Sequence, residues 1–458
     1  MFNFNLPQKG LFMNERFSKI GFILAVAGSA VGLGNAWKFP TLVGTNGGSA
    51  FIVLYLVLTL LVSFVIFLAE MSMGRISRKD AFGAFETLAP KHGKIWRYAG
   101  LCIVGAILIF SFYSVIMGWI LKYVVSSGFY LPKTMDESAA IFTKLLTKDF
   151  GLNLVYFTIA VLMSFWVVSR GIKSGIERLN VWMMPALFIM LIVMLLYSAT
   201  MDGFGESVKF MLKPDFSALN KDSVLMALGL AFFTLSLGVG TIMTYSASLP
   251  EDTDLVKSSL SIVFINILIG VMMGLIVFTF IFEFGANPRE QGPGLVFISL
   301  ATLFSNLGAF GNVFAVMFFV SLLFAALTSA VSMIEPSVLY LMNNHGFSRK
   351  KALKYIFVFV YVMGTFCILS YQSATSETFT FFGKPFFDVL DYLTSNIMMP
   401  ITGILVSIFV GFVMKRELVY ELFVPYMGEA MFKVWYFLLR FVAPTAVAII
   451  MINQLFFA

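Results

Sequence analysis

The chain has 458 residues, of which 59% are hydrophobic and 12% are charged, against roughly 25% charged in ordinary soluble proteins. This composition provides too little polar surface to cover even one soluble domain, so the soluble globular classes are excluded. The formal net charge of +7 does not indicate nucleic-acid binding, because Lys and Arg lie in short loops between apolar blocks, without a basic stripe interleaved with aromatics.

The apolar residues fall in blocks of about 20, the length that a helix needs to cross the hydrocarbon core of a membrane. They predict an all-α membrane protein in which residues 1–458 form one transmembrane domain of about eleven helices. The predicted spans are 18–42, 48–74, 98–128, 152–169, 178–199, 224–248, 258–284, 309–342, 352–371, 383–413 and 435–456. We expect the first block to stay in the fold, because it is too long for a cleaved signal and lacks a small-residue cleavage site.

Basic residues indicate the orientation of these spans. With a cytoplasmic N-terminus, the inner loops contain Arg75, Arg78, Lys79, Lys91, Lys94, Arg97, Arg170, Lys173, Arg178, Arg349, Lys350, Lys351, Lys354, Lys415 and Arg416. This bias follows the positive-inside rule, and an odd number of spans then puts the C-terminus outside. We expect a multi-pass protein of the inner (cell) membrane with lipid around it.

Two spans carry glycine-rich interruptions: AGSAVGLGN at 27–35 in the first and TLSLGVG at 234–240 in the sixth. Each glycine weakens a helix by about 1 kcal/mol. One reading is close helix packing, which small residues usually serve in membranes. The five-span separation instead suggests two inverted five-helix repeats, 18–199 and 224–413, with 435–456 as an additional span. Matching breaks of this kind predict a midplane site in which helix ends face an anion and freed carbonyls face a cation.

Several segments match a known family in sequence and in order. They are AGSAVGLGNAWKFP (27–40), NGGSAFIVLY (46–55), EMSMGR (70–75), SRGIKSGIERLN (169–180), FFTLSLGVG (232–240) and AALTSAVSMIEP (325–336). With these motifs the chain resembles the neurotransmitter:sodium symporter family, in particular its bacterial-type sodium-dependent amino acid transporters with the leucine-transporter fold, an inverted-repeat architecture with broken helices 1 and 6. The resemblance implies a sodium-coupled symporter that imports an amino acid by alternating access.

The resemblance also implies a substrate site across both breaks. The N–H groups of Leu33 and Gly34 and the Tyr113 hydroxyl would hold the carboxylate of the amino acid. The ammonium would be held by the carbonyls of Ala30, Phe233 and Thr234 and by the Ser236 hydroxyl. The side-chain pocket would consist of Ile109, Tyr113, Phe233, Val239, Ser329 and Met333. For the apolar members taken alone, core packing is the alternative.

Two sodium sites are implied in the same way. One would use the carbonyls of Gly28, Val31 and Ala325 and the hydroxyls of Thr328 and Ser329. For these two hydroxyls the alternative is hydrogen bonding to their own helix. The other site would use the Ala30 carbonyl, the amides of Asn35 and Asn266, and Thr234, with the carboxylate of the substrate completing the shell. A membrane Asn taken alone more often makes a helix–helix hydrogen bond.

Charged residues within the spans are expected to form gates and braces. Lys38 and Asp391 match the outer gate pair of the family, with Phe233 as the lid; a plain stabilising ion pair is the alternative. Because Lys38 replaces the usual Arg, the bidentate fork is lost. By the resemblance Glu70 braces both broken helices. Gly175 and Pro185 match a motif that lets the fifth span unwind at its inner end, with a simple proline kink as the alternative.

The inner gate is less well indicated. Arg16 matches its cation, but Asn343 stands where relatives carry the acidic partner, and Ser248 stands where they often carry Tyr.

Two departures from the family bear on the transported species. Chloride-dependent relatives surround the anion with Tyr, Gln, Ser and Thr or Asn. Here Tyr55 and Thr234 remain, but Leu230 and Gly270 replace two ligands, which predicts transport without chloride. Gly32 stands where monoamine-transporting relatives have Asp, so the substrate must bring its own carboxylate. Val239 and Met333 leave room for a large apolar or aromatic side chain.

Other functional classes are less well supported. A substrate-gated channel or sensor built on the same fold is the alternative, but the ring of polar residues or filter loop expected of a continuous pore is absent from the sequence. Enzymatic activity is not expected, because the only histidines, His92 and His345, lie in loops without a nucleophile or metal constellation around them.

Overall fold

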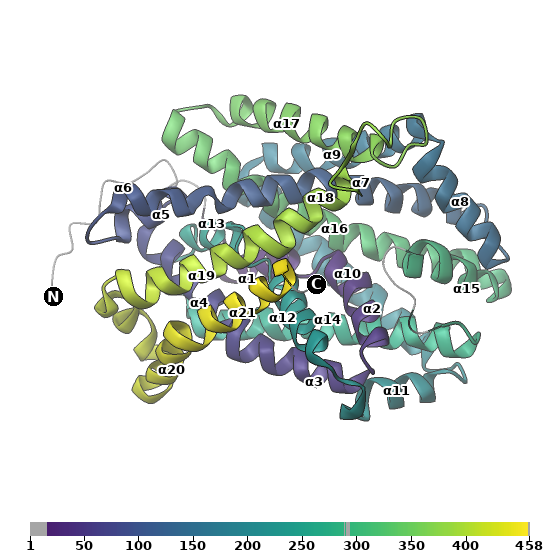
Figure 1. The fold of residues 1–458 in the computed structure, drawn as a ribbon, viewed down its shortest axis with the longest axis horizontal. Coiled ribbons are helices and arrows are strands. Elements are labelled where there is room, and N and C mark those ends of the chain that lie inside the picture. The colour runs from purple at the N-terminus through teal and green to yellow at the C-terminus, as the bar shows by residue number, and fades with distance from the viewer. Residues whose placement is uncertain (1–15, 288, 290–293, 457–458) are drawn as a thin grey trace.

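The structure is a computed structural model, and it describes residues 16–287, 289 and 294–456. Nearly all regular elements are helices, as the sequence predicts (Figure 1). Those of the first half are α1 (Lys19–Ala30), α2 (Phe39–Thr45), α3 (Ser49–Leu58), α4 (Phe64–Ser77), α5 (Ala81–Leu88), α6 (Gly93–Trp96), α7 (Cys102–Ser127), α8 (Met135–Thr147), α9 (Phe150–Ser169), α10 (Arg178–Ser198) and α11 (Phe204–Leu212).

The second half continues the helical pattern. Its elements are α12 (Lys221–Thr234), α13 (Thr241–Ala247), α14 (Leu255–Glu283), α15 (Ala301–Ser305), α16 (Gly311–His345), α17 (Arg349–Leu369), α18 (Phe386–Tyr392), α19 (Met399–Ile408), α20 (Arg416–Phe437) and α21 (Ala443–Phe456), with a small hairpin of β1 (Thr380–Phe381) and β2 (Lys384–Pro385). Short π-helical turns join several neighbours, as at Gly34–Lys38, Thr59–Ser63, Ile172–Glu177, Leu295–Leu300, Leu393–Met398, Phe409–Val413 and Leu438–Val442.

Within the described residues, nine helical segments are long and apolar enough to cross a membrane. They are Ser49–Ser77, Gly93–Ser127, Phe150–Ser169, Ile172–Ser198, Leu255–Glu283, Gly311–His345, Arg349–Leu369, Phe386–Val413 and Arg416–Asn453. Lys19–Ala30 and Gly34–Thr45, bent by 61°, make a tenth if counted as one span. The predicted sixth span is split into α12 and α13, each too short to cross alone. The count of eleven crossings therefore stays a prediction.

The last predicted span differs most from the structure. We expected a loop from 414 to 434 and a span over 435–456, whereas the helical segment begins at Arg416 and is interrupted at Gly428, whose φ is 75°. α20 packs against α4 and α14 and lies at a margin of the bundle in Figure 1, and α21 packs against α19.

Around the predicted site, α1 packs against α10, α14 and α16, and α16 also packs along α7. α5 and α6 lie at one end of the molecule and α8 and α15 at the other (Figure 1). We refer to the end with α5 and α6 as the inner end and to the end with α8 and α15 as the outer end, according to the predicted orientation. The broken first helix is thus enclosed by long apolar helices, and its freed backbone groups face other protein groups.

Candidate functional site

Both predicted helix breaks are present. α1 ends at Ala30, Val31 is extended with φ −79° and ψ 100°, and the chain resumes helical geometry at Gly34. α12 ends at Thr234 and α13 begins at Thr241. In the second break Ser236, Gly238 and Gly240 have φ of 52°, 76° and 76°. Glycine adopts this left-handed region without the steric penalty that a side chain brings, which explains why the break is glycine-rich.

The second break is held by a fully buried carboxylate. Glu70 Oε1 accepts a 2.8 Å hydrogen bond from the Gly238 N–H. This agrees with a bracing role toward the sixth span. The predicted brace to the first break stays a prediction, since the hydrogen bond that the structure gives for Glu70 reaches only the second.

A small cavity of about 30 Å³ lies between the two breaks. It is lined by Ser29, Ala30, Gly32, Leu33, Gly34, Ile109, Tyr113, Phe233, Ser236, Val239, Ser329, Met333 and Met399. Every predicted substrate-site residue except Thr234 is in this lining. Ser29, Gly32 and Met399 were not predicted as substrate-binding residues. Ser29 and Gly32 could have been inferred from their place in the first break, whereas Met399 lies in α19 and carries no motif.

The polar groups of the cavity pair with one another. The Leu33 N–H donates to Tyr113 Oη at 3.3 Å, which places the two groups predicted to hold a carboxylate side by side. Ser236 Oγ donates to the Ser29 carbonyl at 2.8 Å and so joins the two breaks. One end of the cavity is therefore polar, and Ile109, Val239, Met333 and Met399 make the rest of its wall apolar.

Three of the residues predicted for the sodium site next to the substrate, Asn35, Thr234 and Asn266, belong to one buried network. Asn35 Nδ2 donates to the carbonyl of Asn266 at 2.9 Å and to its Oδ1 at 3.0 Å, and Asn266 Nδ2 donates to Tyr55 Oη at 3.3 Å. Tyr55 Oη and Thr234 Oγ1 lie 3.0 Å apart, which explains why Thr234 faces away from the cavity. Asn35 Oδ1 is buried without a hydrogen-bond partner among the described residues. A buried amide oxygen of this kind suits a hard cation.

The residues predicted for the other sodium site, with ligands from Gly28, Val31, Ala325, Thr328 and Ser329, also come together. Ser329 Oγ donates to the carbonyls of Gly28 at 3.1 Å and Val31 at 3.3 Å. Thr328 Oγ1 donates to the carbonyls of Phe324 and Ala325, both at 3.0 Å. Ser329 thus bonds across to the first break, while Thr328 shows the bonding to its own helix that was the alternative for both.

A larger cavity of about 610 Å³ lies toward the outer end. Leu33, Tyr113 and Phe233 line both cavities, so these residues separate them. Lys38 Nζ lies 3.7 Å from Asp391 Oδ1 and 3.9 Å from the centre of the Phe233 ring. The three predicted outer-gate residues therefore meet above the central cavity.

Two polar side chains of the fifth span pack onto glycines of α1. Glu177 Oε1 accepts a 2.5 Å hydrogen bond from the Ser18 hydroxyl, and a Cβ on Gly21 would lie 2.1 Å from this carboxylate oxygen. A Cβ on Gly28 would likewise lie 2.0 Å from Asn180 Oδ1. Neither side chain was predicted as a site residue, although both lie in the quoted motif SRGIKSGIERLN. The hydrogen bond of Glu177 ties the start of α1 to the fifth span, and both close approaches require glycine on α1.

Partners for the segment around Arg16 lie on one loop, between α13 and α14. Arg16 lies 3.7 Å from Glu251, with both side chains exposed, and the Phe17 N–H donates to the Ser248 carbonyl at 3.2 Å. Lys19 lies 2.6 Å from Asp252, and its hydrogen bond lowers the pKa of Asp252 below its ordinary value. Exposed pairs of this kind are screened by solvent and contribute little to stability, so the contact is weak enough to open.

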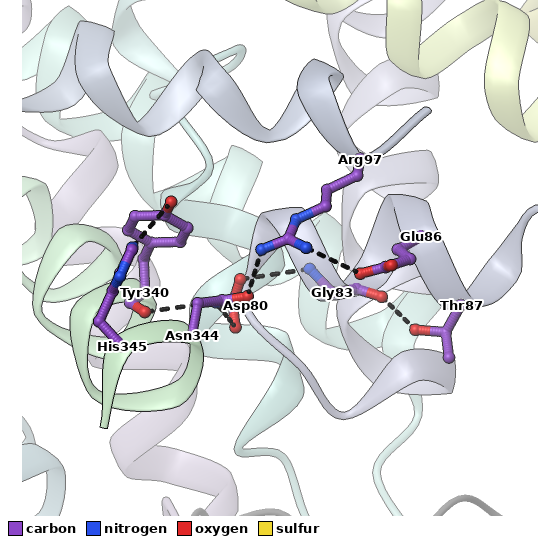
Figure 2. Close-up of polar contacts among 8 residues, drawn as sticks. All are labelled: Asp80, Gly83, Glu86, Thr87, Arg97, Tyr340, Asn344 and His345. Carbon is purple, nitrogen blue, oxygen red and sulfur yellow. Dashed lines mark hydrogen bonds and ion pairs between the residues drawn. The ribbon is translucent and has the colours of Figure 1, made fainter. Parts of the chain in front are cut away.

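Asn343 joins a different cluster at the same end. It donates to Asp80 Oδ2 at 3.0 Å, and Asn344 donates to the same oxygen at 3.3 Å. Figure 2 shows Arg97 linking Asn344, at 3.1 Å, to Glu86, at 3.8 Å. Asn343 therefore stands in place of the expected acidic partner, and it binds Asp80, the N-cap residue of α5.

Comparisons with known proteins match this geometry. The profile of the sodium:neurotransmitter symporter family matches residues 14–137 and 135–457. An uncharacterized sodium-dependent transporter, YhdH of Bacillus subtilis, is 40% identical over 95% of this chain and 96% of its own length. One of Haemophilus influenzae is 34% identical over 96% and 97%. The crystal structure of MhsT in complex with L-phenylalanine superimposes with a TM-score of 0.87, covering 96% of this chain and 99% of MhsT, at 35% identity.

Proposed function

Because the chain belongs to the sodium:neurotransmitter symporter family, a family of sodium-dependent membrane transporters, we propose that it imports an α-amino acid with a large apolar or aromatic side chain. Two sodium ions drive the import by alternating access. The observation that carries this proposal is the cavity between the two helix breaks, polar at one end and apolar elsewhere.

The polar end supports a substrate that carries its own carboxylate. Gly32 lines the cavity, and a Cβ at this position would lie 2.7 Å from Ser329 Oγ and 3.0 Å from Tyr113 Oη. A larger acidic side chain therefore does not fit there without displacing both hydroxyls. No Asp or Glu is among the described residues that line the cavity. The negative charge that a sodium ion at Asn35 and Asn266 needs therefore has to come from the substrate. A buried cation without such a partner costs several kcal/mol.

The apolar wall supports a large side chain. Ile109, Val239, Met333 and Met399 line the cavity, and Met side chains repack readily around different shapes. At about 30 Å³ the cavity has room for roughly two waters, so a large substrate needs these side chains and the Phe233 lid to move. The phenylalanine bound by the similar protein MhsT is consistent with such a movement.

The gates support alternating access. At the outer end, Lys38, Asp391 and Phe233 separate the small cavity from the larger outer cavity. At the inner end, the hydrogen bond between Ser18 and Glu177 holds the start of α1 against the fifth span. Substrate and sodium would enter past Phe233. Their release would need α1 to move away from α10, which breaks a few hydrogen bonds and opens a path to the inner side. Gly175 and the π turn at Ile172–Glu177 give the inner end of the fifth span the flexibility for this movement.

Uptake by the purified protein in liposomes tests the proposal. An inward sodium gradient should drive the accumulation of leucine, methionine, tyrosine or tryptophan, and a sodium ionophore should abolish it. Because these substrates carry no net charge, two coupled sodium ions move two charges per molecule, whereas a channel gives no fixed ratio. Accumulation without a sodium gradient, or a preference for glycine over every bulky amino acid, would refute the proposal.

A further inference from the structure

Asn180 is a buried polar residue to which the proposed mechanism gives no role. It lies in the first turn of α10, and its side chain is fully buried. Its Nδ2 donates to the carbonyl of Ile176 at 2.8 Å, which fixes the orientation of the amide. Its Oδ1 has no hydrogen-bond partner among the described residues. A buried amide oxygen without a partner is unfavourable, so it calls for a function.

This oxygen points at the first helix break. A Cβ built on Gly28 would lie 2.0 Å from Asn180 Oδ1 and 3.0 Å from Thr328 Cβ, so the three residues converge at one place. The Gly28 carbonyl there already accepts a hydrogen bond from Ser329. At position 28, therefore, only glycine lets the amide oxygen approach the α1 backbone this closely.

We propose that Asn180 Oδ1 is a further ligand of the sodium ion bound by Gly28, Val31, Ala325, Thr328 and Ser329. The inference rests on the proposed function, because it adds an oxygen to one of the two proposed sodium sites. A neutral amide oxygen is a suitable ligand for a hard cation. It also raises the number of oxygens from five to six without adding charge to the membrane interior.

The position of Asn180 gives this ligand a second consequence. It belongs to α10, directly after the π turn at Ile172–Glu177, whereas the other five ligands belong to α1, to the break that follows it at Val31, and to α16. Sodium would therefore connect α10 to the other two helices. When the inner end of α10 unwinds, the amide oxygen leaves with it, and the sodium ion loses a ligand on the side that opens to the cytoplasm.

The test compares sodium affinity in four variants of the full-length protein, measured as the sodium concentration for half-maximal substrate binding and by direct binding of radioactive sodium. Asn180→Leu keeps the branched shape and the number of side-chain heavy atoms but removes the oxygen, and should weaken sodium binding about tenfold, as expected for the loss of one contact to a charged group. Asn180→Asp keeps the oxygen and adds a negative charge, and should tighten sodium binding. Thr328→Ala reports on the site itself.

Asn153→Leu is the matched control. This buried Asn accepts a hydrogen bond from Trp119 Nε1 at 3.2 Å, and neither residue is a proposed sodium ligand, so its loss should leave sodium affinity unchanged. Unchanged affinity in Asn180→Leu beside an impaired Thr328→Ala would overturn the ligand role and leave the proposed function intact. Unchanged affinity in Thr328→Ala would overturn the sodium site, and this ligand with it. If Asn180→Leu fails to fold, Asn180→Asp decides: a purely structural wedge gives no gain in sodium affinity.

Discussion

The two adjacent hydroxyls of α16 should not contribute equally to sodium binding. Ser329 Oγ donates to the carbonyls of Gly28 and Val31, which are also proposed to bind sodium, so the ion has to displace these hydrogen bonds. Thr328 Oγ1 donates within its own helix and can keep the Phe324 carbonyl as acceptor while its lone pair faces the ion. Two of the three carbonyls that Ser329 Oγ contacts are proposed sodium ligands, against one of the two that Thr328 Oγ1 contacts. Sodium binding therefore competes more strongly with the hydrogen bonds of Ser329.

The difference can be given a magnitude. A contact to a charged group contributes about 1.5–3 kcal/mol, so Thr328→Ala should weaken sodium binding about 10- to 150-fold. Ser329→Ala loses a similar contact but also removes the competing hydrogen bond, worth about 1 kcal/mol. The net loss is about 0.5–2 kcal/mol, or about 2- to 30-fold in affinity.

Sodium titrations of substrate uptake in proteoliposomes measure both values, with the total amount of folded transporter as the normalisation. The double variant Thr328→Ala, Ser329→Ala should lose sodium-driven uptake altogether. Ser329→Ala weakening sodium binding more than Thr328→Ala would refute the competition argument, and unchanged sodium dependence in the double variant would refute the site.

Three further predictions follow from the gate, the missing chloride ligands and Gly32. Asp391→Asn removes a partly exposed ion pair and should weaken apparent substrate affinity by no more than about fivefold. Lys38→Arg should restore a bidentate pair and slow substrate release. A loss of more than about fiftyfold in substrate-binding assays of Asp391→Asn would contradict a weak gate. Replacing chloride by gluconate should leave uptake unchanged, because Leu230 and Gly270 supply no anion ligand beside Tyr55 and Thr234, and uptake that stops in gluconate would disprove this. Tryptamine and tyramine should compete for uptake far less well than tryptophan and tyrosine, since they lack the carboxylate; equal competition would show that the protein completes the sodium shell itself.

Much of the fold can be predicted from local patterns in the sequence. Apolar blocks of membrane-spanning length predict the helices because lipid offers no partner to an unpaired backbone group. The glycine runs at 27–35 and 234–240 predict where two helices break, and the structure breaks them there, since the φ values at Gly238 and Gly240 are ones that other residues rarely adopt. The motifs of the family also predict nearly all residues around the central cavity.

Other features depend on which surfaces meet, and no local pattern carries them. Met399 enters the cavity from α19 because that helix packs close to the second break: a Cβ on Gly238 would lie 2.5 Å from the Met399 carbonyl. From the sequence alone, Asn180 is one more membrane Asn, which would be expected to make a helix–helix hydrogen bond. Only the packing of its helix against Gly28 places its unpaired oxygen beside the proposed sodium ligands. The sequence determines which residues can bind an ion, because that follows from side-chain chemistry and backbone freedom. Only the packing of α10 against α1 decides that this particular amide oxygen is buried beside the others.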